Sequence, residues 1–242
     1  MLKILSKEIS SYLNSLIAYI VISVFLTGIG LFMWIFPDTN VLDYGFADMS
    51  TLFTFAPYVF LFLIPAITMR LFAEEKKSGT MELLFTRPLT DMQIILGKYF
   101  AGLLIVVLAL LPTLIYYYTI YQLGQVPGNI DTAGVAGSYI GLLLLAAAFT
   151  AIGVFSSSLT VNQIVAFIIA VFLCFFFYIG FGSIAEIDVW GNASVVLEQL
   201  GILYHYNAMS KGLIDARNVV YLVSLTVLML LFTQLVIGSR KW

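Results

Sequence analysis

The sequence predicts an all-α integral membrane protein with six transmembrane helices, an amphipathic helix before the first span and short external interfacial helices between the fifth and sixth. Of its 242 residues, 62% are hydrophobic and only 10% are charged, and the mean hydropathy is +1.04. A soluble globule of this size needs more polar surface than this composition provides. Long apolar runs separated by short polar segments indicate helices that cross a bilayer.

Six runs reach the length that a transmembrane helix requires. A helix rises 1.5 Å per residue, so roughly 20 residues cross about 30 Å of hydrocarbon. The predicted spans lie near residues 16–36, 52–72, 98–121, 135–157, 161–183 and 218–238. With their connections they are expected to form a single transmembrane domain over residues 1–242.

Residues 2–15 are predicted to form an amphipathic helix at the membrane surface. Its apolar side chains recur at helical spacing, at Leu2, Leu5, Ile9, Tyr12, Leu13 and Leu16. A cleavable signal peptide is the alternative, but the first long apolar run begins only near Leu16, and no small-residue cleavage motif follows a short apolar core. We therefore expect the helix to be retained and to bend into the first span.

The distribution of lysine and arginine predicts the orientation. If the N-terminus is cytoplasmic, nine of the 11 basic residues lie inside and only Lys211 and Arg217 lie outside. The inside set is Lys3, Lys7, Arg70, Lys76, Lys77, Arg87, Lys98, Arg240 and Lys241. Cytoplasmic loops carry such an excess, so both termini are predicted to be cytoplasmic. Arg70 and Lys98 lie near span ends, from which long side chains can extend to the headgroups.

Local features within and between the spans predict how the helices are shaped and packed. Pro57 and Pro65 are expected to kink the second span, and Pro112 the third. Gly137 and Gly141 form a Gly-x-x-x-Gly pair that permits close helix packing within the chain. The polar residues between 156 and 163 are expected to form a tight cytoplasmic turn between spans four and five, and residues 184–217 are expected to form short helices in the outer interface.

The densest run of charge lies between the second and third spans, in residues 74–90. It carries six ionisable side chains, each of which would cost roughly 2.5–3.5 kcal/mol at a bilayer centre, so the segment is expected to lie in water. Met81, Leu84 and Phe85 fall at the i, i+3, i+4 spacing of one helix face. Two interpretations remain open: a short helix that docks on a protein, or a loop that folds back on the lipid surface.

The ends of this short helix are also predicted. Ser78 or Thr80 is a candidate cap at its start, and Pro88 disfavours helix at the preceding residue, so the helix is expected to end there. Thr90 with Gln93 then matches a capping box that opens the next helix.

Several functional classes are excluded by missing motifs. A phosphate-binding loop needs Gly-x-x-x-x-Gly-Lys and then Ser or Thr, but the pair Gly97-Lys98 has Met92 and Tyr99 at the required positions. The sole histidine, His205, is expected to be an ordinary interfacial residue, and no catalytic, cofactor or metal site is predicted. A net charge of −2 with pI about 5.3 lacks the basic patch typical of nucleic-acid binding.

The charged segment also carries a family resemblance. Its pattern Glu-Glu-x-x-x-Gly-Thr-x-Glu-x-Leu, followed by Pro-Leu-Thr, is similar to the signature of type-2 ABC transporter permeases. More narrowly, it resembles the gliding-motility-associated ABC transporter permease, a relative of the nitrous-oxide-reductase maturation permease. Residues 157–163 and 212–217 support the resemblance, which extends over nearly the whole chain.

The resemblance implies a permease subunit of a bacterial inner-membrane ABC transporter, an exporter or a gliding-motility-associated complex. Residues 74–90 would form the coupling helix that docks on a separate cytoplasmic ATPase subunit. The implied ATPase-coupling residues are Glu74, Glu75, Gly79, Thr80, Met81, Glu82, Leu84, Phe85 and Pro88. A second permease copy or a paralogous membrane subunit and the lipid bilayer would complete the partners, with no cofactor, no nucleic acid and no enzymatic activity in this chain.

One alternative is a non-transporting membrane anchor or mechanotransmission subunit, which would use the same ATPase contact to move an extracytoplasmic partner. ATP-dependent solute movement in vesicles distinguishes the two. A membrane-embedded enzyme is a more distant alternative, because it requires catalytic groups within the spans that the sequence lacks.

Overall fold

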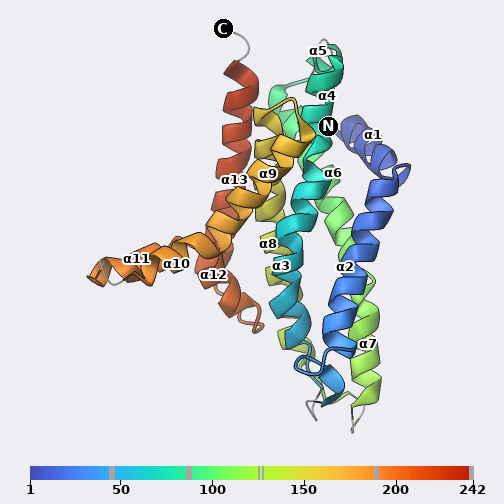
Figure 1. The fold of residues 1–242 in the computed structure, drawn as a ribbon, viewed down its shortest axis with the longest axis vertical. Helices are drawn as coiled ribbons and strands as arrows, with labels where there is room; N and C mark the ends of the chain where they lie inside the picture. Colours follow the sequence, from blue (N-terminus) through green and yellow to red (C-terminus); the bar gives the residue numbers. More distant parts are fainter. Residues whose placement is uncertain (44–46, 86–88, 125, 127, 188–190, 240–242) are drawn as a thin grey trace.

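The computed structural model describes residues 1–43, 47–85, 89–124, 126, 128–187 and 191–239, and every regular element among them is a helix (Figure 1). The all-α membrane fold is therefore confirmed. The long helices are α2 (Leu16–Trp34), α3 (Ser50–Thr68), α6 (Asp91–Leu110), α8 (Thr132–Leu159), α9 (Gln163–Phe175) and α13 (Ala216–Gly238). The short ones are α1 (Leu2–Leu13), η1 (Val41–Asp43), α4 (Arg70–Ser78), α5 (Thr80–Phe85), α7 (Thr113–Leu123), η2 (Phe176–Gly180), α10 (Phe181–Ala185), η3 (Gly191–Ala193), α11 (Ser194–Gln199) and α12 (Ile202–Met209).

In the described part of the chain, five helical stretches are long and apolar enough to cross a membrane. They are Ser50–Ser78, Asp91–Leu123, Thr132–Leu159, Gln163–Ala185 and Ala216–Gly238. A sixth results if Leu2–Leu13 and Ala18–Trp34, which meet at a bend of 69°, count as one broken span. A helix therefore lies at each position where the sequence predicts a span.

The centre of the bundle is α8, which packs against α3, α6, α9 and α13. Its crossing with α3 is close because Gly153 has no side chain: a Cβ atom there would lie 2.0 Å from Thr68 Oγ1. At the same level, a Cβ on Gly102 of α6 would lie 3.3 Å from Thr150 Cγ2. Small residues thus allow three helices to approach one another at a single level of the bundle.

The Gly-x-x-x-Gly pair at the start of α8 packs within the chain, as predicted. A Cβ on Gly137 would lie 2.6 Å from the carbonyl oxygen of Gly212, and one on Gly141 would lie 2.7 Å from Met209 Cβ. Both neighbours belong to α12 or the turn that follows it, so the glycines seat this short helix against α8.

Pro112 separates α6 from α7, as expected of a helix-breaking proline. Pro57 and Pro65 do not interrupt the second span, because both lie inside α3. The span that begins with α9 passes through a π-helical turn at Phe176–Gly180 before it continues as α10. From there α10 and α11 extend sideways from the bundle (Figure 1), and the described residues between 184 and 217 include the short helices α11 and α12. Their place in the outer interface stays a prediction.

His205 is not the ordinary interfacial residue that the sequence predicts. It is 8% exposed, and its ring is stacked on Tyr221 with 4.0 Å between the ring centroids. Nδ1 lies 2.8 Å from Asn218 Oδ1, and Nε2 lies 2.8 Å from the carbonyl oxygen of Gln199. His205 therefore ties the end of α11 to the start of α13.

The turn between α8 and α9 is shorter than predicted. Ser156–Ser158 are fully buried inside α8, and the turn consists of residues 160–162. Asn162 caps α9 by accepting a hydrogen bond from the backbone N–H of Ile164, 2.9 Å away. The hydroxyls of Ser156 and Ser158 donate to carbonyls of α8 itself, whereas the Ser157 hydroxyl binds the backbone near the start of α4.

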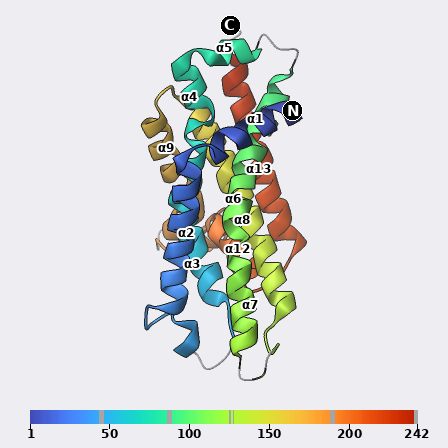
Figure 2. The ribbon, with the colours of Figure 1, turned by 90° about the vertical axis from the view of Figure 1, so that its right-hand side faces the viewer.

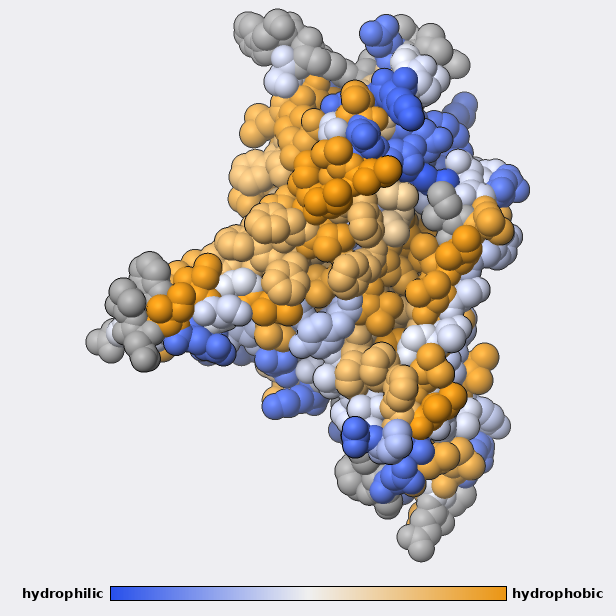
Figure 3. Space-filling model, in the orientation of Figure 1, coloured by the Kyte–Doolittle hydropathy of each residue, from blue (hydrophilic) through white to orange (hydrophobic). Residues whose placement is uncertain are grey.

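The two ends of the bundle differ. The short helices α1 and α5 and the C-terminal end of α13 lie at one end, and the turns after α2 and α7 lie at the other (Figure 2). Between the ends, the surface in Figure 3 is predominantly hydrophobic, as expected for a face that contacts lipid. The end that carries α5 also carries the charged segment of the sequence.

Thiol labelling tests which end faces the cytoplasm. Single cysteines at the exposed positions Asp43 and Asp131, in a Cys174→Ser background, are expected to react with an impermeant reagent added to intact cells, whereas one at Lys77 is expected to react only after lysis. Labelling of Lys77 alone in intact cells would reverse the orientation.

Candidate functional site

The helix that carries the predicted coupling segment begins at a braced break. After α3 the chain turns at Met69 and continues as α4, and the backbone groups freed at this turn find partners on other helices. On α8, Ser157 Oγ donates to the carbonyl of Met69 (2.8 Å) and accepts from the N–H groups of Phe72 (3.0 Å) and Ala73 (3.1 Å). The carbonyl of Leu71 accepts a hydrogen bond from Lys98 Nζ at 2.6 Å.

The N-terminal helix braces the same turn from another side. The hydroxyl of Tyr12 donates to the carbonyl of Ile67, and the Arg70 guanidinium lies 3.9 Å from the centroid of the Tyr12 ring. Arg70 also donates from Nη1 to Ser15 Oγ at 3.1 Å. Arg70 thus contacts α1 and the turn that follows it.

Four charged side chains from three helices meet beside this turn. They are Lys7 and Glu8 of α1, Glu75 of α4 and Lys98 of α6, and we call them the four-charge cluster. Lys98 Nζ lies 2.8 Å from Glu8 Oε1 and 2.9 Å from Glu75 Oε2, and Lys7 Nζ lies 2.7 Å from Glu75 Oε1 and 3.4 Å from Glu8 Oε1. Each lysine therefore contacts both carboxylates.

Burial within the cluster is uneven. The Lys98 side chain is 0% exposed, Glu8 and Glu75 are about nine-tenths buried, and Lys7 is 57% exposed. Burial lowers the pKa of Lys7, but the hydrogen bond to Glu75 and the charges of Glu8 and Glu75 outweigh it, and the pKa is raised. Burial raises the pKa of Glu75, but the charges of Lys98 and Lys7 and their hydrogen bonds outweigh it, and that pKa is lowered. The cluster thus combines two lysines with two carboxylates.

The cluster bears on two expectations from the sequence. Lys98 does not extend to the headgroups, because its ammonium is enclosed by two carboxylates and a carbonyl. The Glu75 carboxylate pairs with Lys98 and Lys7 inside the chain, and its contact with an ATPase stays a prediction. A buried charge needs such partners, and here they are intramolecular.

The apolar face of α5 is also partly used within the chain. Met81 is 8% exposed and belongs to the buried core, and Leu84 packs partly buried against the core. Both side chains thus have neighbours within this chain, and their entry into a cleft of another protein stays a prediction. The Phe85 side chain and residues 86–88, with Pro88, lie outside the described part of the chain.

The rest of the segment faces outward. Gly79 ends α4 with φ of +71°, a left-handed conformation that glycine adopts without strain. Glu74, Thr80 and Glu82 are exposed, as is Lys77, which the sequence does not single out. These side chains form the outward surface of α4 and α5.

The start of the next helix agrees with the sequence. Gln93 N–H donates to Thr90 Oγ1 and Thr90 N–H donates to Gln93 Oε1, both at 3.3 Å, so the predicted capping box is confirmed. It starts α6 at Asp91, two turns before Lys98. Ser78, by contrast, does not cap α5, because its hydroxyl donates back to the carbonyl of Glu74 at 2.9 Å.

Sequence reasoning missed the role of Glu8 and Lys98. The signal was present in α1, where Ile4, Glu8 and Tyr12 recur at i, i+4, i+8 and form the buried face. A carboxylate between two apolar residues on one helix face indicates a buried partner of opposite charge. Leu2 and Leu13, which were expected on the side of an amphipathic helix that faces the membrane, are exposed.

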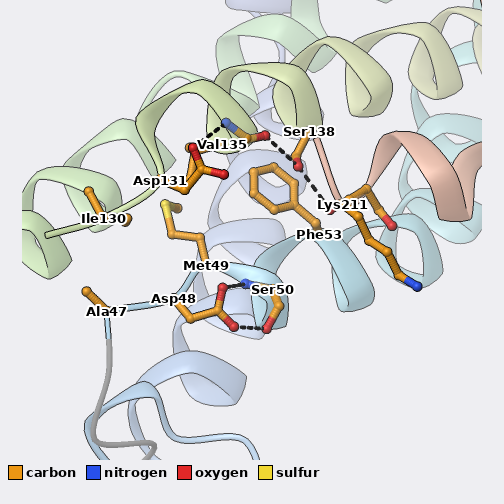
Figure 4. A pocket seen from close by; sticks show the side chains of 12 residues that line it. Ala47, Asp48, Met49, Ser50, Phe53, Ile130, Asp131, Val135, Ser138 and Lys211 are labelled. Carbon is orange, nitrogen blue, oxygen red and sulfur yellow. Dashed lines mark hydrogen bonds between the residues drawn. The ribbon is translucent and has the colours of Figure 1, made fainter. Parts of the chain in front are cut away.

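The opposite end of the bundle holds a cavity of about 240 Å³ between α3, α8 and the turn after α12 (Figure 4). Its carboxylates have local partners: Asp48 accepts the N–H of Ser50 at 3.0 Å, and Asp131 accepts the N–H of Gly134 at 2.9 Å. These contacts stabilise the starts of α3 and α8. Among the described residues, no group of three or more metal-ligating side chains comes together.

A second surface feature is an apolar groove of about 530 Å³ along α2 and α3, with Phe167 of α9 at its edge. Its lining is almost purely apolar, and it belongs to the hydrophobic face between the two ends. The described residues that line the groove thus include no charged side chain, in contrast to the four-charge cluster near the α5 end.

Comparison with known proteins gives one family match. The model of a family described as ABC-2 family transporter protein matches residues 3–239, nearly the whole chain. No curated protein matches the chain.

Proposed function

The chain belongs to the ABC-2 transporter family, a family of membrane components of ABC transporters, and from this premise we propose that it is a permease subunit that couples ATP hydrolysis by a separate cytoplasmic ATPase to movement of its spans. In this proposal the protein is multi-pass in a bacterial inner membrane, both termini are cytoplasmic, and a second permease copy or a paralogous subunit completes the membrane part. The narrower resemblance of residues 74–90 supports a place in a gliding-motility-associated complex.

One observation carries the proposal: the α4–α5 segment is exposed at its tip and braced at its base. Its tip presents Glu74, Lys77, Thr80 and Glu82 to the outside. Its base is bound by Tyr12, Ser157 and Lys98, which come from α1, α8 and α6. A force applied to the tip would therefore reach three other helices without passing through a flexible linker.

The partly buried apolar face of α5 changes which residues are proposed to contact the ATPase. Glu74, Thr80 and Glu82 remain candidates, Lys77 joins them, and Glu75 and Met81 are assigned to the support of the segment. Gly79 acts through its left-handed conformation, which ends α4 and lets α5 take another direction (Figure 2).

Added positive charge on α5 tests the proposed contact between the tip of the segment and the ATPase. Glu82→Arg with Thr80→Arg is expected to lower the affinity for the co-expressed ATPase more than tenfold, because a misplaced charge in an interface costs several kcal/mol and each 1.4 kcal/mol is a factor of ten. The measurement is the ratio of ATPase to permease recovered from detergent.

The matched control is Glu198→Arg, an exposed glutamate on α11 far from the α5 end. This variant is expected to recover the ATPase at the wild-type ratio. Equal ratios for all three proteins would favour the lipid-surface interpretation of the segment. If wild type recovers no ATPase under conditions that preserve other ABC complexes, the coupling proposal itself fails.

A further inference from the structure

We propose that the four-charge cluster is a rigid joint that makes α1, α4 and the first turns of α6 move as one body, and that Lys98 is its positioning residue. The proposal concerns Lys7, Glu8, Glu75 and Lys98, of which only Glu75 has a role implied by the family resemblance. Its consequence for transport rests on the proposed function, since it carries movement of α5 to α1. The joint itself is a property of this chain alone.

The pairing pattern is what makes the cluster a joint. Three of its four contacts join different helices, and two of these start from α1: Glu8 pairs with Lys98 of α6, and Lys7 pairs with Glu75 of α4. Lys98 also pairs with Glu75, which closes the triangle of helices. If α1 moved without α4 and α6, both contacts from α1 would break and Lys98 would lose one of its two carboxylates in a buried site.

The backbone geometry holds the charges in place. A Cβ on Gly97 would lie 3.0 Å from Ile4 Cγ2, so α1 lies directly against the backbone of α6 one residue before Lys98. One turn further along α1, Glu8 faces Lys98, and one more turn on, Tyr12 binds the carbonyl of Ile67. Three successive turns of α1 are thus attached to the bundle.

The outer faces of α1 suit a helix that moves at the membrane surface. Leu2, Leu5, Ile9 and Leu13 lie beside the buried face and form an apolar stripe, while Lys3, Ser6 and Lys7 lie on the water-facing side. The helix meets α2 at a bend of 69°, so it lies across the direction of the first span. A body made of α1 and α4 would connect the tip of the coupling segment to the inner surface of the bilayer.

A joint and a simple stabilising contact predict different behaviour once all the buried charge is removed. Replacing a whole buried ion cluster by apolar residues of similar volume often leaves stability unchanged, whereas orientation set by charge pairing is lost. The triple variant Glu8→Met, Glu75→Met, Lys98→Met therefore separates the two roles. Lys7 stays in place because it is largely exposed.

The experiment measures the distance between α1 and α4 directly. Spin labels are placed on cysteines at Ser6 and Lys77, two exposed positions outside the cluster, in a Cys174→Ser background. The wild-type chain, purified without any ATPase, is expected to show one narrow distance distribution. The triple variant is expected to melt within a few degrees of wild type. Its distance distribution is nevertheless expected to be at least twice as wide as that of wild type. A triple variant as narrow as wild type would overturn the joint.

A second variant covers the case in which the triple variant does not fold. Glu8→Gln keeps the size of the side chain and removes only the charge that pairs α1 with Lys98 of α6. If charge pairing sets the position of α1, this variant shows a broader Ser6–Lys77 distribution than wild type; a distribution as narrow as that of wild type would overturn the proposal.

With the ATPase present, the Ser6–Lys77 distance of wild type is expected to stay constant between the nucleotide-free and ATP-bound complexes, because the two helices move together. A change in that distance on ATP binding would contradict a rigid joint. Failure of the proposed function gives a different result, because no ATPase then co-purifies with the chain. The widths of the Ser6–Lys77 distance distributions measured without the ATPase do not depend on that outcome.

Discussion

Lys98→Met is expected to lower the free energy of unfolding by about 3–5 kcal/mol, the typical effect of removing one partner from a buried ion pair. The Lys98 side chain is fully buried, and its loss leaves Glu8 and Glu75, both about nine-tenths buried, with the exposed Lys7 as their shared cation. It also removes the donor to the carbonyl of Leu71 at the α3–α4 turn. The measurement is thermal unfolding of the purified chain in detergent.

Lys77→Met is the matched control, since it makes the same chemical change at an exposed position of α4. Its effect is expected to stay within about 0.5 kcal/mol, as for most surface substitutions. If Lys98→Met melts at the same temperature as Lys77→Met, the cluster does not stabilise the fold. Adding Glu8→Met and Glu75→Met to Lys98→Met is expected to restore most of the loss, because the unpaired carboxylates are then removed as well.

Gly153→Val is expected to destabilise the bundle by about 3 kcal/mol, at the upper end of the usual cost of overpacking a core. A Cβ at this position would lie 2.0 Å from Thr68 Oγ1 and 2.8 Å from Thr68 Cβ, so α3 and α8 must separate. The same thermal unfolding measurement applies. Since Ser157 of α8 binds the α3–α4 turn, separation of the two helices would also weaken the base of the coupling segment.

The control for this substitution is Gly28→Ala in α2, where a Cβ would meet nothing within 4 Å. Alanine there is expected to leave stability unchanged or to raise it by up to about 1 kcal/mol, because alanine favours a helix more than glycine does. Thr68→Ala is expected to recover part of the loss in Gly153→Val by removing the clashing hydroxyl. Equal melting of Gly153→Val and wild type would show that the α3–α8 crossing is adaptable.

Features that depend on near neighbours in the sequence were predictable. The capping box of Thr90 and Gln93 spans three residues, and the break at Pro112 follows from the chemistry of one residue. The Gly137–Gly141 pair indicated close packing within the chain, although its partner, the turn after α12, could not be identified from spacing.

The face of α1 was less predictable, because hydrophobic periodicity assumes one apolar side and one polar side. This helix has three neighbours: the bundle, lipid and water. The bundle takes Ile4, Glu8 and Tyr12, and the apolar stripe that dominates the pattern is left on the outside. Glu8 on the most buried face does not fit a hydrophobic periodicity, and its burial is understandable only once its partner Lys98 is known.

The sequence by itself determined the class of the protein, because composition and the length of the apolar runs leave no soluble alternative, and it carried the family pattern in residues 74–90. Only the tertiary structure decided which residues of that pattern face outward and which support it. Glu8 and Lys98 are 90 positions apart, and they meet because Gly97 lets α1 lie against α6. The energy of a charged side chain depends on its burial and on the partners around it, and helix crossings establish both. The same Glu75 that reads as a surface charge in the sequence is therefore part of a buried cluster in the fold.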